Sequence, residues 1–225
     1  HEALEHPIAS PRLRDLAKGK QKVVLVTSDH TRAVPSKITL PILLDEIRHF
    51  RDTHPAPSEA SDRVPHPRYL YYGQEIWESA AAALLCGEHL LLAGPKATGK
   101  NVLAENLAAV FGRPVWDVSM YVNVDAAALI GADTLQDGRV AFREGPVCKC
   151  ARLGGFGVLD EVNMAKNEAL AVLHATLDHR RVIDVPGYER IHLDESTRFI
   201  GTMNYGYAGT RELNEALVSR FVVLD

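Results

Sequence analysis

The sequence has few cysteines, which limits the disulfides and metal sites that it can form. Cys86, Cys148 and Cys150 are the only three in 225 residues. An odd, low number indicates a reducing compartment rather than a disulfide framework. Cys148 and Cys150 lack a second Cys or His pair at metal-ligand spacing, so we interpret them as ordinary helix cysteines.

Long apolar runs and a strong charge excess are absent too. The longest apolar stretches, 80–86 and 90–93, are too short to cross a bilayer, and the charged, proline-containing residues 1–10 do not form a secretory signal. The sequence therefore predicts a cytoplasmic protein with no membrane partner. A net charge of −4 argues against non-specific nucleic-acid binding as the main task, and no specific nucleic-acid partner is expected. Because the chain lacks an initial Met and stops directly after an apolar run, we expect a piece of a longer protein.

The remaining composition separates into three zones. Hydrophobic residues make up 46% of the chain, enough for a sizeable core. Within residues 1–51, the apolar run 23–26, a polar loop and the helical spacing of apolar residues over 38–50 predict a strand, a loop and a helix. Residues 52–67 contain four prolines and no apolar period, which predicts a linker.

The third zone, 68–225, alternates apolar strands with helices, which predicts an α/β three-layer sandwich around a five-stranded parallel sheet. Helices are expected over 71–85, 100–111, 126–130, 167–178 and 211–218, and strands over 88–93, 115–119, 155–159, 199–203 and 221–224. Two hairpins are expected to interrupt this rhythm, one around Asp137-Gly138 and one around Pro186-Gly187.

One loop matches the pattern G-x-x-x-x-G-K between a predicted strand and a predicted helix, the context that this motif requires. Its backbone N–H groups would meet phosphate oxygens, its glycines allow the tight path, and its lysine brings a charge to the β- and γ-phosphates. The bland alternative is a chance glycine-rich turn. The predicted ATP-binding residues are Gly94, Pro95, Lys96, Ala97, Thr98, Gly99, Lys100 and Asn101.

The last residue of this loop departs from the pattern. A Ser or Thr hydroxyl usually ligates Mg²⁺ there, whereas this chain has Asn101. An amide oxygen can also ligate Mg²⁺, with a different reach. The change leaves ATP binding better supported than fast hydrolysis.

Two further strands end in polar residues. The strand 155–159 leads into Asp160, a predicted Mg²⁺ ligand, and Glu161, which would orient and deprotonate the attacking water. Asn204 follows the strand 199–203 and could bond the same water or the γ-phosphate. Solvated strand-end acids and a turn asparagine are the alternatives when each is judged alone.

An arginine stands where the last predicted helix runs into the last strand. Arg220 could neutralise charge on the ATP of a neighbouring subunit, in which case hydrolysis requires a ring. Arg211 is a weaker candidate for this task, and a surface arginine is the alternative reading of both.

Together these residues resemble the nucleotide-binding domain of AAA+ ATPases, in the clade of MoxR-type, CbbQ/NorQ, midasin and dynein modules. Gly94 to Lys100 match Walker A, 158–161 Walker B, Asn204 sensor 1 and Arg220 the arginine finger. The resemblance implies a P-loop fold with hairpin insertions and a homo-hexamer using ATP and Mg²⁺. It also implies a chaperone whose hairpins engage a client protein such as a metalloenzyme. The helical lid of the family would begin beyond Asp225 and is expected to be absent from this chain.

The first zone resembles part of the N-terminal domain of nickel-pincer lactate racemases. The match rests on 6–8, 23–26 and the string Asp29-x-Thr31-Arg32, and it implies contacts from these three residues to a nickel-pincer nucleotide. An ordinary strand-to-helix loop is the alternative. The later catalytic histidines and lysine of that family have no counterpart here.

Three functions therefore stay open. The leading hypothesis is an ATP-hydrolysing chaperone. A second is a nucleotide-dependent binding module that scarcely hydrolyses ATP. A third is a racemase-like protein in which the ATPase part acts as a regulator.

Overall fold

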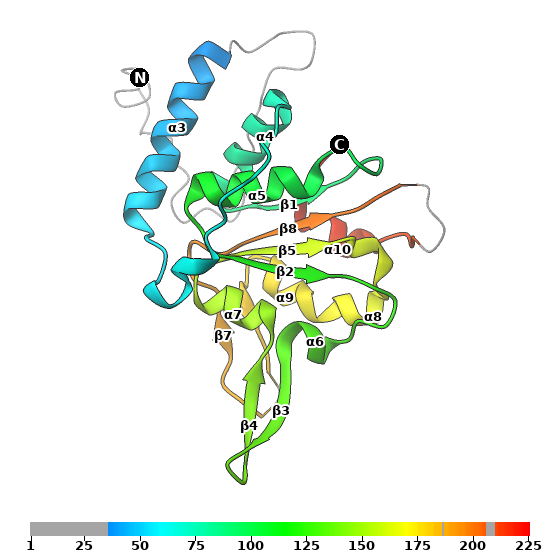
Figure 1. Ribbon diagram of the computed structural model, residues 1–225. Coiled ribbons are helices and arrows are strands. Elements are labelled where there is room, and N and C mark those ends of the chain that lie inside the picture. The colour runs from blue at the N-terminus through cyan, green and yellow to red at the C-terminus, as the bar shows by residue number, and fades with distance from the viewer. Residues whose placement is uncertain (1–35, 186, 206–209) are drawn as a thin grey trace.

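The computed structural model describes residues 36–185, 187–205 and 210–225, and its centre is a five-stranded sheet (Figure 1). Every neighbouring pair in the sheet is parallel, in the order β2-β5-β8-β1-β9. The strands are β1 (His89–Leu92), β2 (Val115–Ser119), β5 (Phe156–Asp160), β8 (Arg198–Thr202) and β9 (Phe221–Leu224). Helices cover both faces, so the predicted three-layer α/β fold is confirmed.

The strand order decides which loops meet. In a parallel sheet all carboxyl ends lie along one edge, and ligands bind in the crevice beyond it. β8 lies between β5 and β1, with Leu90 opposite Ile200 and Leu159 opposite Gly201. The loops after β1, β5 and β8 therefore open side by side.

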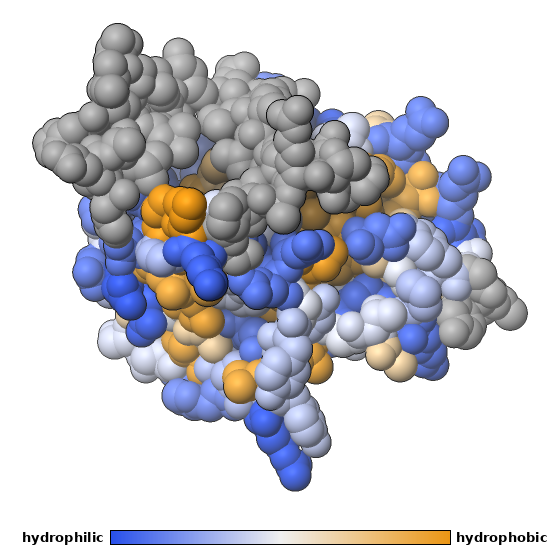
Figure 2. Space-filling model, turned by 90° about the horizontal axis from the view of Figure 1, so that it is seen from above, coloured by the Kyte–Doolittle hydropathy of each residue, from blue (hydrophilic) through white to orange (hydrophobic). Residues whose placement is uncertain are grey.

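One face is covered by α3 (Ser36–Thr53), α4 (Gln74–Leu85) and α5 (Lys100–Phe111). Phe50 of α3, Leu84 of α4 and Phe111 of α5 pack with Val158 and Ile200 of the sheet in one buried cluster. Seen from above, the outer surface of this layer exposes apolar residues among polar ones (Figure 2), and Ile38 on α3 is 63% exposed.

The predicted linker is structured. A 3₁₀ helix, η1 (Ser58–Arg63), stands within it, and Ala60 is fully buried. Arg113 donates to the carbonyl oxygen of His54, and the Arg63 guanidinium lies 5.2 Å from the centroid of the Trp116 ring. Composition alone missed these contacts because both arginines and their partners belong to segments far apart in sequence.

The opposite face carries α6 (Ala126–Ile130), α7 (Pro146–Arg152), α8 (Asn167–Leu170), α9 (His174–Leu177) and α10 (Glu215–Val218), with the 3₁₀ turns η2 (Val162–Met164) and η3 (Ala171–Leu173). The two helix cysteines are both buried in α7, as predicted, and burial raises the pKa of Cys148 to about 12. These thiols are therefore inert at neutral pH.

Three expected helices are shorter than predicted. The one predicted over 71–85 begins only at Gln74. The one predicted over 167–178 is divided into α8, η3 and α9. The one predicted over 211–218 begins only at Glu215, because the side chain of Asn214 accepts a hydrogen bond from the Ala216 N–H at 2.8 Å and caps the helix there.

Both hairpins are present. β3 (Gly131–Gln136) and β4 (Arg139–Glu144) form a ribbon that projects from the body (Figure 1), and Asp137 and Gly138 at its tip both have positive φ, as a tight two-residue turn requires. The second pairs β6 (Val182–Ile183) with β7 (Ile191–His192). The Tyr188 hydroxyl donates to Asp133 at 2.7 Å, which ties the second hairpin to the first.

None of the helices in the described ranges is long and apolar enough to cross a membrane.

Candidate functional site

The loop between β1 and α5 wraps around the ammonium group of Lys100. The Lys100 Nζ donates to the carbonyl oxygens of Gly94 at 3.1 Å and Pro95 at 2.6 Å, and to the Thr98 hydroxyl at 3.3 Å. Gly94 and Gly99 have φ angles of 140° and 86°, which favour glycine. The loop thus has the tight path that a phosphate cradle requires, with the first turn of α5 at its end.

Acidic side chains surround this lysine on the same edge of the sheet. Burial lowers the pKa of Lys100, and the charges of Asp160, Asp225 and Glu161 act in the opposite direction. The structure therefore brings the predicted phosphate-binding lysine and the predicted acidic pair together, although they are about 60 residues apart in sequence.

Asp160 stands at the end of β5 and is held by two donors. The Asn101 Nδ2 donates to its Oδ1 at 3.1 Å, and the Thr202 hydroxyl donates to the same oxygen at 2.7 Å. This leaves the Oδ2 of Asp160 and the Oδ1 of Asn101 as oxygen donors. Hard oxygen ligands in small number fit Mg²⁺, which takes its other ligands from water and phosphate. No cluster of three or more His, Cys, Asp or Glu able to hold a metal occurs in the part of the chain that the structure describes, so an all-protein cage is absent there.

Glu161 follows directly and has a left-handed backbone, with φ 56°. Its N–H donates to the Thr202 hydroxyl at 3.0 Å, and its Oε1 accepts a hydrogen bond from the Asn204 Nδ2 at 3.0 Å. Asn163 in turn donates to the Asn204 carbonyl oxygen at 2.8 Å. Glu161, predicted to deprotonate the attacking water, is thus in contact with Asn204, predicted to bond the same water.

Arg220 lies at the other edge of the sheet. It precedes Phe221, which pairs with His89 at the amino end of β1, whereas Lys100 lies beyond the carboxyl end. Its guanidinium donates to the His174 carbonyl oxygen at 3.1 Å and lies 3.4 Å from Asp178. The structure therefore does not bring Arg220 to the phosphate loop of its own chain.

The remaining predicted residues are Arg211 and the three racemase-like candidates. The Arg211 N–H donates to the Asn163 carbonyl oxygen at 2.8 Å, close to Asn204. The racemase-like candidates Asp29, Thr31 and Arg32 lie outside the described residues.

Two residues at this site were missed by sequence reasoning. Thr202 stands two positions before Asn204, and its place at the end of a predicted strand could have put it at the same edge of the sheet. Tyr71 was hidden in a predicted helix. Its ring carbons lie 3.5 Å from the position that a Cβ on Gly99 would take, so the ring packs against the phosphate loop.

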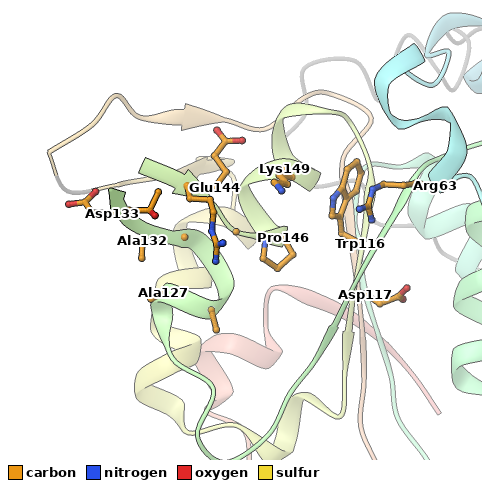
Figure 3. A pocket seen from close by; sticks show the side chains of 14 residues that line it. Arg63, Trp116, Asp117, Ala127, Ala132, Asp133, Glu144, Pro146 and Lys149 are labelled. Carbon is orange, nitrogen blue, oxygen red and sulfur yellow. The ribbon is translucent and has the colours of Figure 1, made fainter. Parts of the chain in front are cut away.

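A separate hollow lies at the base of the first hairpin (Figure 3). Its volume is about 580 Å³, and its walls include Arg63, Trp116, Asp117 and Lys149. Burial, followed by the charge of Asp160, raises the pKa of Asp117. The Trp116 Nε1 is buried without a hydrogen-bond partner among the described residues. No residue of the loop 94–101 lines these walls, so the hollow is separate from the candidate phosphate site.

Comparison with known proteins agrees with this geometry. Residues 89–221, more than half of the chain, match the AAA domain of the dynein-related subfamily, and residues 1–54 match the lactate racemase N-terminal domain. A crystal structure of a presumed ATPase from Cytophaga hutchinsonii superposes with a TM-score of 0.56 at 19% identity, covering 84% of this chain and 54% of that one. At this identity the likeness shows the fold alone.

The curated relatives are bacterial. The uncharacterized protein YojN of Bacillus subtilis is 35% identical over 193 residues, covering 84% of this chain and 64% of the relative. An uncharacterized protein of Staphylococcus saprophyticus is 35% identical over 168 residues, covering 72% of this chain and 64% of the relative. The chain spans less than two thirds of the length of these relatives. The match to YojN covers more of the chain than residues 68–225, so the similarity reaches upstream of Arg68.

The family match encloses the phosphate loop, the acidic pair, Asn204 and Arg220, and the strand order brings the first three together at one edge of the sheet. On these findings the chain belongs to the dynein-related subfamily of AAA domains, a family of P-loop ATPases.

Proposed function

We propose that this chain binds ATP at the loop 94–101 and hydrolyses it. The observation that carries the proposal is the hydrogen bond from Asn101, at the start of α5, to Asp160, at the end of β5. This bond brings the end of the phosphate loop into contact with the end of the acidic strand.

Each residue then has a task. The loop N–H groups and Lys100 bind the β- and γ-phosphates. Asp160 and the amide oxygen of Asn101 would hold Mg²⁺, which would neutralise phosphate charge. Glu161 accepts a proton from the attacking water, and Asn204 orients that water together with Glu161.

We further propose that hydrolysis takes place in a ring, in which Arg220 serves the site of a neighbouring copy. Support comes from the position of Arg220 at the amino ends of the strands, whereas its own phosphate loop lies at their carboxyl ends. A hexameric chaperone of the MoxR or CbbQ/NorQ kind, acting on a client protein, agrees with this arrangement. The match of residues 1–54 to the lactate racemase N-terminal domain favours a metalloenzyme as the client.

The test is ATP binding and turnover by three variants. Lys100→Ala removes the phosphate-binding charge, so both ATP affinity and turnover are expected to be lost. Glu161→Gln keeps the loop and is expected to retain affinity while turnover falls roughly 10²- to 10⁴-fold, the usual contribution of a general base. Lys37→Ala removes an exposed lysine of α3, outside the loop, and is the matched control, expected to behave as wild type.

Equal turnover in wild type, Lys100→Ala and Glu161→Gln would exclude the site. ATP affinity that depends on Lys100 without any turnover, even at concentrations where rings form, would favour a nucleotide-dependent binding module. Asn101 in place of a Ser or Thr is the observation behind that second candidate.

A racemase-like role, with the ATPase part as regulator, is a third candidate, which the match of residues 1–54 supports. It predicts that protein produced with nickel and the pincer cofactor carries both. Metal analysis and the absorbance spectrum of the purified protein test this. A preparation that contains neither nickel nor the cofactor would contradict the role.

A further inference from the structure

One buried hydroxyl joins the two acidic residues of the site. The Thr202 Oγ1 donates to the Asp160 Oδ1 at 2.7 Å and accepts the Glu161 N–H at 3.0 Å. A hydroxyl has one proton to donate and lone pairs to accept, so both bonds form at once. Thr202 is 1% exposed, so no bulk water competes for either partner.

The sheet fixes this contact. Leu159 of β5 is opposite Gly201 of β8, so the next residues, Asp160 and Thr202, end their strands at the same level. Thr202 is also opposite Leu92, the last residue of β1 before the phosphate loop. Strand alternation puts it on the face of Ile200, which packs against α5. The hydroxyl therefore lies on the side of the sheet where Asn101 reaches Asp160.

The two hydrogen bonds act on different residues. The first, made to a carboxylate and therefore short and strong, occupies the Oδ1 that also receives Asn101, which leaves Oδ2 toward the metal. The second fixes the N–H of Glu161, whose left-handed backbone is a sparsely populated conformation that needs support from its surroundings. Without the hydroxyl, Asp160 could rotate and the Glu161 peptide could relax.

We propose that Thr202 is a positioning residue that sets the orientation of the metal-binding carboxylate and of the general base through one hydroxyl group. The inference rests on the proposed function, because it assigns Asp160 to the metal and Glu161 to the water. The Thr202 hydroxyl bonds Asp160 and Glu161 rather than the loop 94–101, so we expect it to affect metal binding and not the affinity for metal-free nucleotide.

The test compares wild type with Thr202→Val, which keeps the shape and removes the hydroxyl, and with Thr202→Ser, which keeps the hydroxyl. The affinity for a fluorescent ATP analogue is measured in EDTA and over a Mg²⁺ titration, and ATP turnover is followed alongside. Thr202→Val is expected to need roughly 10- to 100-fold more Mg²⁺ for the same gain in affinity, as loss of a partner of a metal ligand commonly costs. Its affinity in EDTA should equal that of wild type, and Thr202→Ser should restore the Mg²⁺ response.

A Thr202→Val protein with the wild-type Mg²⁺ response and turnover would overturn the inference. So would a Thr202→Ser protein as impaired as Thr202→Val, since packing would then be the cause. If Thr202→Val does not fold, Thr202→Ala removes the hydroxyl without placing a methyl group against the carboxylate. Its Mg²⁺ response and turnover are then compared with those of wild type, with the same expected and contradicting results. Lys100→Ala separates the two proposals, because unchanged nucleotide affinity in that variant would reject the proposed function itself.

Discussion

The buried cations of this chain are held by backbone carbonyl oxygens. Arg198 is 5% exposed and donates to the carbonyl oxygens of Leu84 at 2.9 Å, Glu195 at 2.6 Å and Thr197 at 2.8 Å. Burial lowers its pKa to about 9. Because a guanidinium has five N–H donors, it can satisfy several strand and loop ends that would otherwise remain unpaired. This arginine therefore stabilises the amino edge of the sheet rather than a ligand.

His89 is a titratable residue whose pKa is lowered by burial and by neighbouring arginines. It is buried at the start of β1, and its Nδ1 accepts the Phe199 N–H at 3.0 Å. Burial, then the charges of Arg181 and Arg198, lower its pKa well below 6.5. The folded protein thus keeps His89 neutral at a pH where the unfolded chain would bind a proton.

This predicts acid destabilisation. Below pH 6.5 the unfolded state takes up a proton that the folded state excludes, so the free energy of unfolding falls as pH falls, by at most about 1.4 kcal/mol per pH unit from this residue. Above pH 6.5 neither state binds the proton and the effect vanishes. Urea unfolding of wild type and His89→Gln between pH 5 and pH 8 checks it, since the Gln amide accepts the Phe199 N–H without titrating. Parallel pH profiles of the two proteins would contradict the assignment.

At the scale of elements, α3 belongs to the packed core of the ATPase fold. Its Phe50 is 8% exposed and lies edge-on to Phe111 of α5, with ring centroids 5.3 Å apart. Ile47 of the same helix is 2% exposed in the same cluster. A zone that composition assigned to a separate N-terminal segment thus covers part of the sheet, and we propose that the folding unit begins at or before Ser36.

Substitution on the two faces of α3 tests this boundary. Phe50→Ala should cost roughly 3–5 kcal/mol of unfolding free energy, because it leaves a cavity between α3 and α5. Ile38→Ala, on an exposed position of the same helix, should change it by less than about 0.5 kcal/mol. Chemical unfolding followed by circular dichroism measures both. A separate early transition for α3, with the remaining transition unchanged, would show that the helix is an appendage.

Over the whole molecule, the two cations of the proposed reaction lie at opposite ends of the strands. Lys100 is beyond the carboxyl end of β1, and Arg220 is at the amino end of β9. Strands of four to five residues span roughly 13–17 Å, and Arg220 stands at the end remote from Lys100. Asp178 lies 3.4 Å from Arg220, and bonding to Arg180 and the charge of Arg220 hold the pKa of Asp178 well below its usual range. The arginine therefore lies away from the phosphate loop of its own chain, as the proposed action on another copy requires.

Mixing two inactive variants tests action between copies. Lys100→Ala keeps Arg220 but loses its own site, and Arg220→Ala keeps its site but loses the arginine. Each alone is expected to lose turnover, by roughly 10³- to 10⁵-fold for an arginine of this type. A mixture should regain measurable ATP turnover, because a Lys100→Ala copy can supply Arg220 to an intact site. A mixture as inactive as its parts, although light scattering shows mixed rings, would contradict the proposal.

Short-range pattern was enough to place much of this protein. The Lys100–Phe111 helix, the Val115–Ser119 and Phe221–Leu224 strands and the hairpin at Asp137-Gly138 follow from apolar period and turn residues, which act over a few positions. The phosphate loop was recognisable for the same reason, since its glycines and lysine are consecutive. The interruptions of the 167–178 helix were not predictable, because helical period persists across a 3₁₀ turn.

The sequence by itself determined the parallel α/β architecture and the places of the loop 94–101 and the acids 160–161 after its strands, because local pattern and residue type carry that information. Only the tertiary structure decided that Thr202 bridges Asp160 and Glu161, that Ala60 is buried and that α3 completes the core. These contacts join positions separated by dozens of residues. Strand order and register bring them together, and neither is encoded in any one stretch of the chain.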